Sequence, residues 1–145
     1  LNRDEGYTNL CFQLLIYPVL DFTFSLSSHR TYAEGFRILN KKTIEWFRHH
    51  YIPDSANWTN GRASPLYAAS HANLPPSLIL LAELDILFDE GVEHYKKLKM
   101  AKSPSELQIF QGMVHGFFTA SGVLTKAREA QEVAIESLRS AFSNQ

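Results

Sequence analysis

The sequence predicts an α/β fold in which parallel strands are flanked by helices. Three short apolar runs alternate along the chain with three helical patterns, which is the order typical of this class. The first two runs are nearly continuous stretches of apolar residues, as in central strands that are covered on both faces. A length of 145 residues is enough for one domain.

The three predicted strands each have a recognisable boundary or pattern. The first run, residues 12–17, ends at Pro18, which cannot donate a hydrogen bond to a neighbouring strand. The second, residues 78–82, follows the sequence LPP. The third, residues 106–110, alternates between polar and apolar side chains, so we expect one of its faces to be more polar.

The predicted helices are marked by caps and by apolar spacing. Asn40 is a candidate N-cap of a helix whose apolar residues are Ile44, Phe47 and Tyr51. Asp89 and Glu90 open the second helix, where carboxylates complement the helix dipole. The apolar face of that helix is predicted to consist of Val92, Tyr95 and Leu98. The last helix is predicted to pack through Ala127, Ala130, Ala134, Leu138 and Ala141.

Composition excludes several classes of protein. Fourteen basic and fifteen acidic residues give a formal net charge of −1, which provides no general electrostatic attraction for nucleic acid. The apolar runs are far shorter than the roughly 20 residues needed to span a bilayer. Cys11 is the one cysteine, so no internal disulfide can form. We therefore expect no nucleic-acid partner, no membrane span, no metal and no cofactor, while the compartment stays open.

A candidate active site follows the second and third strands. Asp85 lies three residues past the second predicted strand, and His115 lies five residues past the third. In open α/β sheets ligands bind beyond the carboxyl ends of the strands. An acid followed by a histidine is also the second half of the order Ser, Asp, His found in α/β-hydrolases. Gly112 and Gly116 would allow the histidine loop an unusual backbone conformation.

The histidines and carboxylates also have structural interpretations. A lone loop histidine is more often a surface residue than a catalyst, and we expect this of the five other histidines, none of which follows a strand. These are His29, His49, His50, His71 and His94. A metal site made of Asp85, Asp89 and Glu90 is the less favoured interpretation. The position of Asp89 and Glu90 at a helix start already explains why these two residues are acidic, and the spacing of a calcium-binding loop is not present.

Five stretches in register resemble the C-terminal half of the hormone-sensitive lipase family of α/β-hydrolases. They are QLLIYP (13–18), SPL (64–66), LPP (74–76), AELDILFDEG (82–91) and GMVHGF (112–117). The family contains esterases and lipases that cleave carboxylic esters. The resemblance implies that Asp85 is the triad acid and His115 the triad base, that Asp89 and Glu90 are structural, and that residues 22–58 form part of an acyl pocket. Ile86 and Phe88 stand where the family usually has Pro and Arg.

The resemblance also implies what these 145 residues lack. The family's nucleophile elbow and oxyanion loop precede the first strand predicted here, and the chain contains no Gly-x-Ser-x-Gly sequence. The chain begins with Leu1 and soon enters an apolar run. We therefore expect residues 1–145 to be the C-terminal portion of one α/β-hydrolase domain, inactive alone, which forms an oligomer or associates with the N-terminal half.

Two alternatives to an enzyme that hydrolyses small-molecule esters stay open. The same fold serves in some lineages as a receptor or a pseudoenzyme that does not catalyse a reaction. The persistence of His115 favours the enzyme, since the base is often replaced in hydrolase-like receptors. A purely structural or interaction domain is the second alternative, in which Asp85 and His115 are coincidental. A Gly-x-Ser-x-Gly sequence upstream would distinguish the enzyme from both.

Overall fold

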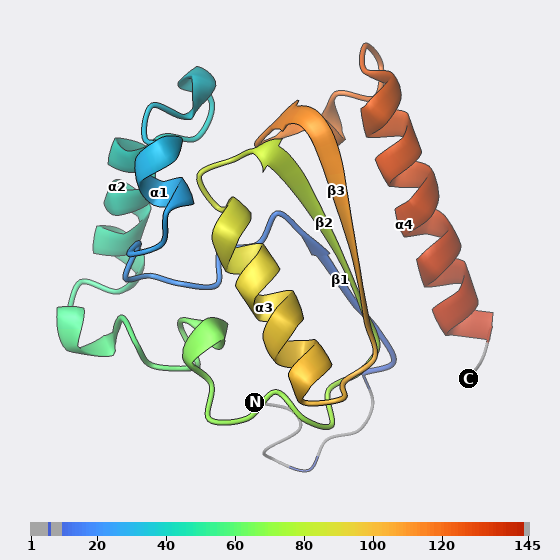
Figure 1. Cartoon of the computed structure of the whole chain (residues 1–145), viewed down its shortest axis with the longest axis horizontal. Helices are drawn as coiled ribbons and strands as arrows, with labels where there is room; N and C mark the ends of the chain where they lie inside the picture. Colours follow the sequence, from blue (N-terminus) through green and yellow to red (C-terminus); the bar gives the residue numbers. More distant parts are fainter. Residues whose placement is uncertain (1–5, 7–9, 144–145) are drawn as a thin grey trace.

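The computed structural model describes residue 6 and residues 10–143, in which a three-stranded parallel sheet lies between helices (Figure 1). The strands are β1 (Gln13–Ile16), β2 (Ser77–Leu84) and β3 (Ser105–Val114), in the order β1-β2-β3. The helices are α1 (Ser28–Thr31), α2 (Lys41–Tyr51), α3 (Phe88–Met100) and α4 (Thr125–Ser143). Short 3-10 helices occupy Gly35–Arg37, Ser55–Asn57, Pro65–Tyr67 and Phe117–Thr119. The predicted α/β class with parallel strands is confirmed.

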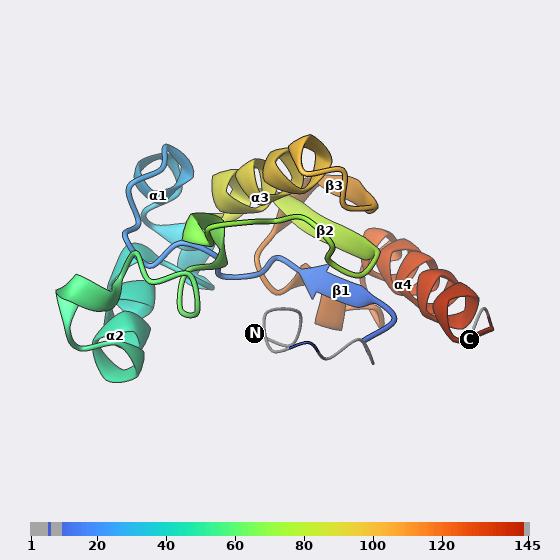
Figure 2. The ribbon, with the colours of Figure 1, turned by 90° about the horizontal axis from the view of Figure 1, so that it is seen from below.

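The two faces of the sheet are covered by different helices, α3 on one side and α4 on the other (Figure 2). Side chains of a strand alternate between faces. Leu78, Leu80 and Ala82 of β2 therefore pack with α4, whereas Ile79 and Leu81 pack with α3. All five are at most 2% exposed. This double coverage explains why the β2 sequence is apolar at successive positions.

Helix α4 packs on the sheet through a stripe of small side chains. Ala127, Ala130 and Ala134 are buried against β2 and β3, as the sequence predicts, while Leu138 and Ala141 are only partly covered. Gly91 permits a similarly close approach in α3, since an added Cβ would lie 2.5 Å from a Leu81 methyl carbon.

Helix α2 begins where the sequence predicts, but only part of its apolar face is buried. The Asn40 side chain accepts a hydrogen bond from the Thr43 N–H at 2.9 Å. Ile44 is buried, whereas Phe47 and Tyr51 are more than half exposed and line a cavity described below. Residues 18–70, drawn in blue and green in Figure 1, lie to one side of α3. In the described part of the chain, no helix combines the length and apolar character needed to cross a membrane.

Both strands that precede the candidate site residues are longer than predicted. Strand β2 continues to Leu84 and β3 to Val114, so Asp85 and His115 each directly follow a strand. The predicted third strand ends at Phe110, before Gln111 and Gly112 interrupt the pattern. The structure accommodates them with a register shift between Ala82 and Leu84 and a positive φ of +72° at Gly112.

Candidate active site

The structure brings together the two side chains that the sequence singles out. An Asp85 carboxylate oxygen, Oδ2, lies 2.8 Å from Nδ1 of His115. The second carboxylate oxygen accepts the Leu87 N–H at 3.0 Å, which fixes the orientation of the carboxyl group. The Asp85 side chain is 1% exposed, whereas that of His115 is 23% exposed. The acid is therefore enclosed, and the imidazole remains accessible to a ligand.

This contact depends on the irregular end of the β2–β3 ladder. Glu83 accepts the Gly112 N–H at 2.6 Å beside the register shift. After β3, Gly116 adopts a φ of +82°, a conformation that side-chain-bearing residues rarely adopt, and the chain enters a 3-10 helix there. The predicted role of both glycines in shaping the histidine loop agrees with these angles.

Tyr17 is a component of the site that sequence reasoning missed. It is the first residue after β1, just as Asp85 and His115 are the first residues after β2 and β3. Its ring centre lies 4.4 Å from that of His115, and its φ is +34°. Burial, with the Asp85 charge adding to it, raises the pKa of the Tyr17 phenol. A tyrosine at a strand end was the available signal, but it was assigned to the strand itself.

An apolar cavity of about 450 Å³ opens beside His115. Tyr17, Tyr51 and His115 are the lining residues with polar side-chain groups, and the remaining side chains are aliphatic or phenyl. These other lining residues are Ile16, Val19, Phe22, Phe24, Leu39, Ile44, Phe47 and Leu87. Most of them lie within residues 22–58, for which the resemblance implies a part in the acyl pocket, whereas Ile16, Val19 and Leu87 lie outside that range. Such a cavity favours an uncharged ligand over an ionised one.

The other histidines divide into two groups. His49 and His50 are exposed, as expected. The expectation of a surface position is wrong for His29, His71 and His94, which are 2%, 7% and 5% exposed. Burial, reinforced by His71 and Lys97, lowers the pKa of His94 to about 4. None of these five histidines lines the cavity beside His115.

Asp89 and Glu90 form hydrogen bonds with residues far away in sequence instead of only opening α3. Asp89 accepts the Ser28 N–H at 2.8 Å, and Glu90 accepts the Leu20 N–H at 3.1 Å. Among the residues the structure describes, no group of three or more His, Cys, Asp or Glu side chains is arranged to hold a metal ion.

Comparison with known proteins relates the chain to hydrolases. The sequence profile described as alpha/beta hydrolase fold matches residues 1–119. The chain is 32% identical over 127 residues to the ethyl acetate hydrolase of Pseudomonas putida, covering 88% of this chain and 40% of that protein. It is 38% identical over 116 residues to the carboxylic ester hydrolase LipN of Mycobacterium tuberculosis, covering 79% and 31% respectively.

Solved esterase structures superpose closely on the same residues. The hyperthermophilic esterase of the archaeon Pyrobaculum calidifontis matches with a TM-score of 0.91 and 32% identity, over 96% of this chain and 46% of that one. The thermostable carboxylesterase EstE1, from a metagenomic library, also gives 0.91, with 33% identity over 97% and 48%. The chain thus spans less than half the length of these relatives.

Proposed function

Because the chain belongs to the α/β-hydrolase fold family, we propose that it supplies the acid and the base of a Ser-His-Asp carboxylic ester hydrolase. The observation that carries this proposal is the 2.8 Å contact between Asp85 and His115 beside an apolar cavity. The named relatives, an ethyl acetate hydrolase and a carboxylic ester hydrolase among them, support the same chemistry.

The geometry supports a different role for each of the two residues. The ionised Asp85 carboxylate accepts a hydrogen bond from His115 Nδ1–H, which leaves Nε2 as the proton acceptor. His115 Nε2 removes the proton from the attacking serine hydroxyl and then returns it to the leaving alcohol. Asp85 holds the tautomer and stabilises the imidazolium ion that forms between these transfers. A water molecule then repeats the sequence to release the acid.

The nucleophile in this proposal lies outside the 145 residues, since they contain no Gly-x-Ser-x-Gly sequence. The substrate class is an ester whose uncharged apolar group fills the cavity beside His115. The aromatic rings of Phe22, Phe24 and Phe47 suit that group, because burying apolar surface contributes about 25 cal/mol per Å².

Turnover of p-nitrophenyl butyrate tests the proposal. In a protein that joins this chain to its nucleophile, we expect His115→Ala to lower kcat by several orders of magnitude, since triad members act as a unit. Asp85→Asn should lower it by about 10⁴-fold because the wrong imidazole tautomer results. The control is His49→Ala, an exposed histidine whose loss should leave kcat unchanged.

The isolated chain provides the complementary measurement. We expect no hydrolysis above that of its own His115→Ala variant. Hydrolysis by the 145 residues that depends on His115 would show that the nucleophile lies within them. Binding of the ester without His115-dependent turnover in the longer protein would instead favour a non-catalytic relative.

The open edge of β1 supports a second proposal, association through that strand. Within residues 10–143, β1 pairs with β2 alone, and its sequence QLLI contains no charge or proline to discourage further pairing. We propose that it pairs with a second copy or with the N-terminal half of the domain. Sedimentation as a monomer at low concentration, with slow amide exchange at Leu14 and Ile16, would contradict this association.

A further inference from the structure

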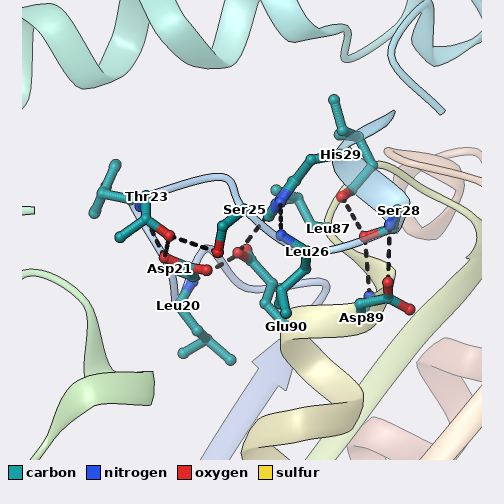
Figure 3. Close-up of polar contacts among 12 residues, drawn as sticks. Leu20, Asp21, Thr23, Ser25, Leu26, Ser28, His29, Leu87, Asp89 and Glu90 are labelled. Atoms are coloured by element: carbon teal, nitrogen blue, oxygen red, sulfur yellow. Dashed lines mark hydrogen bonds and ion pairs between the residues drawn. The ribbon is translucent and has the colours of Figure 1, made fainter. Parts of the chain in front are cut away.

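A second buried polar network lies outside the Asp85–His115 pair and joins residues 20–29 to the first turn of α3 (Figure 3). Glu90 is at its centre and is completely buried. One carboxylate oxygen accepts the Leu20 N–H at 3.1 Å, and the other lies 3.4 Å from Nε2 of His29. Asp21 and His29 are at most 2% exposed.

A second set of bonds holds the same segment near Asp85. The Ser28 N–H donates to the Asp89 carboxylate at 2.8 Å, and the Asp89 N–H lies 3.2 Å from the Ser28 hydroxyl oxygen (Figure 3). The Ser28 hydroxyl donates to the carbonyl of Ile86, the residue after Asp85. Residues 20–29 are therefore attached to the acid-bearing loop at two points, through Glu90 and through Asp89.

The attached segment carries one wall of the cavity beside His115. Val19, Phe22 and Phe24 line that cavity, and Leu20 is the neighbour of Val19. The Phe24 ring packs edge-on against the His29 ring, with 5.2 Å between the centres. Phe24 also has a φ of +51°, a strained conformation that persists only when its surroundings hold it. His29 therefore contacts both Glu90 and Phe24, and Phe24 lines the cavity.

Hydrogen bonding indicates which tautomer of His29 faces Glu90. His29 Nδ1 accepts the Leu26 N–H at 3.2 Å, which in the neutral ring places the proton on Nε2, facing Glu90. Burial raises the pKa of Glu90 to about 7, although His29 and the Leu20 N–H oppose the rise and Asp21 adds to it. Burial thus brings the ionisation of the Glu90 carboxyl closer to neutral pH than that of an exposed glutamate.

Most of the other charged groups nearby have partners of their own, but Oδ2 of Asp21 has no hydrogen-bond partner among the described residues. Asp21 uses one oxygen to accept the Thr23 N–H, and Asp89 binds Ser28. Arg48 of α2 donates to the Phe22 carbonyl, and its guanidinium lies 4.8 Å from the Phe24 ring centre. On α3, His94 lies one turn beyond Glu90 with its ring against His71. The side chains that change the pKa of Glu90 are those of His29, which lowers it, and Asp21, which raises it.

We propose that Glu90 is a positioning residue of the pocket, which holds the cavity wall of Val19, Phe22 and Phe24 at a fixed place relative to Asp85 and His115. Gain or loss of its proton shifts that wall and so changes which apolar groups the cavity accepts. The inference rests on the proposed ester-hydrolase function for its biological meaning. Its structural content, a wall whose position depends on one carboxyl group, can be measured without any turnover.

Nuclear magnetic resonance of the 145-residue chain between pH 5.5 and 8.5 tests the proposal. We expect the amide signals of Leu20, Phe22 and Phe24 to shift with a common midpoint near pH 7. Glu90→Gln retains an acceptor for the Leu20 N–H but cannot ionise, so the shift should disappear. Glu93→Gln is the matched control, because Glu93 is a partly exposed carboxylate of the same helix that pairs with Lys96. The shift should persist in this variant.

A measurement on the unmodified chain keeps the test independent of how well a variant folds. With glutamate labelled at the carboxyl carbon, the Glu90 signal should move at the same midpoint as the three amides. Amide shifts that persist in Glu90→Gln, or a Glu90 carboxyl that titrates without moving these amides, would overturn the proposal. If the ester-hydrolase proposal fails, the same pH-dependent shifts are still expected, because they require no turnover. The two proposals can therefore fail separately.

Discussion

Helix α4 and residues 20–29 are both anchored to the central sheet or its loops, but by different chemistry. Helix α4 packs mainly through the apolar side chains of Ala127, Ala130 and Ala134, and its hydrogen bonds to the Gln111 and Phe118 carbonyls come from the partly covered Lys126 and Gln131. Residues 20–29 are held by the carboxylates of Asp89 and Glu90. Apolar burial is non-directional, whereas hydrogen bonds fix distance and angle. The difference indicates that the helix supplies stability and that the polar network supplies the geometry of the pocket.

The largest effect is expected on the α4 side of the sheet. Leu80 is completely buried between the sheet and α4, so Leu80→Ala should lower the free energy of unfolding by about 2–5 kcal/mol. Urea denaturation measures the change. If the packing of α4 and the polar network are independent of each other, the Ser28 amide should remain hydrogen-bonded to Asp89 in the folded variant. A loss below about 1 kcal/mol would mean that α4 is not supported by this packing.

The pH dependence of stability separates the buried Glu90 carboxyl from the buried His94 imidazole. The folded-state pKa of His94 is about 4, below its ordinary value of 6.5, so the unfolded chain binds more protons between these values. Stability from this group is present above pH 6.5 and falls by on the order of 3 kcal/mol as pH drops through 4. Glu90, with a raised pKa of about 7, has the opposite sign, and its contribution falls as pH rises from 4.5 through 7.

His94→Leu should therefore flatten the acid limb of the stability curve. Urea midpoints measured from pH 4 to pH 8 provide the test, with exposed His49→Gln as the control variant. If His94→Leu loses as much stability at low pH as the unmodified chain, the loss must come from other titrating groups.

The smallest effect is expected at the start of α2, where the stabilising bond is local. Asn40→Ala removes the acceptor for the Thr43 N–H and should cost about 1 kcal/mol. Asn40→Asp keeps an acceptor and should restore most of the loss. Hydrogen exchange should become faster in the first turn of α2 while the amides of residues 20–29 stay protected. Exchange that spreads to those residues would show that the two parts of the pocket wall are coupled.

The sequence-based predictions succeed where signals are local or periodic. Apolar runs identified all three strands, and spacing identified α2, α3 and α4, including the Asn40 cap. The resemblance to the hormone-sensitive lipase family is also confirmed, by the α/β-hydrolase profile and by the esterases that share this fold. The positions of Asp85 and His115 after consecutive parallel strands suffice to predict their proximity, because such strands end at the same edge of the sheet.

Sequence reasoning fails where partners are distant along the chain. Glu90 and Leu20 are 70 residues apart, and Ser28 and Asp89 are 61 apart, so no local pattern links them. Buried His29 was expected at the surface for the same reason. The true end of β3 was missed because polar residues and Gly112 interrupt its pattern, although the strand continues beyond them.

The register shift near the site has a consequence for how this region tolerates changes in length. Between the pairs Ala82–Phe110 and Leu84–Val114, β3 holds residues 111–113 opposite the single residue Glu83. Side chains alternate along a strand, so deletion of one residue here would turn His115 toward the opposite face of the sheet. Deletion of both surplus residues would leave β3 with the same two-residue step as β2, and so remove the irregular segment at Gly112 and its hydrogen bond to Glu83 beside the site. The surplus pair in β3 thus acts as a spacer, and insertions or deletions within it should be far less tolerated than in the surface loops.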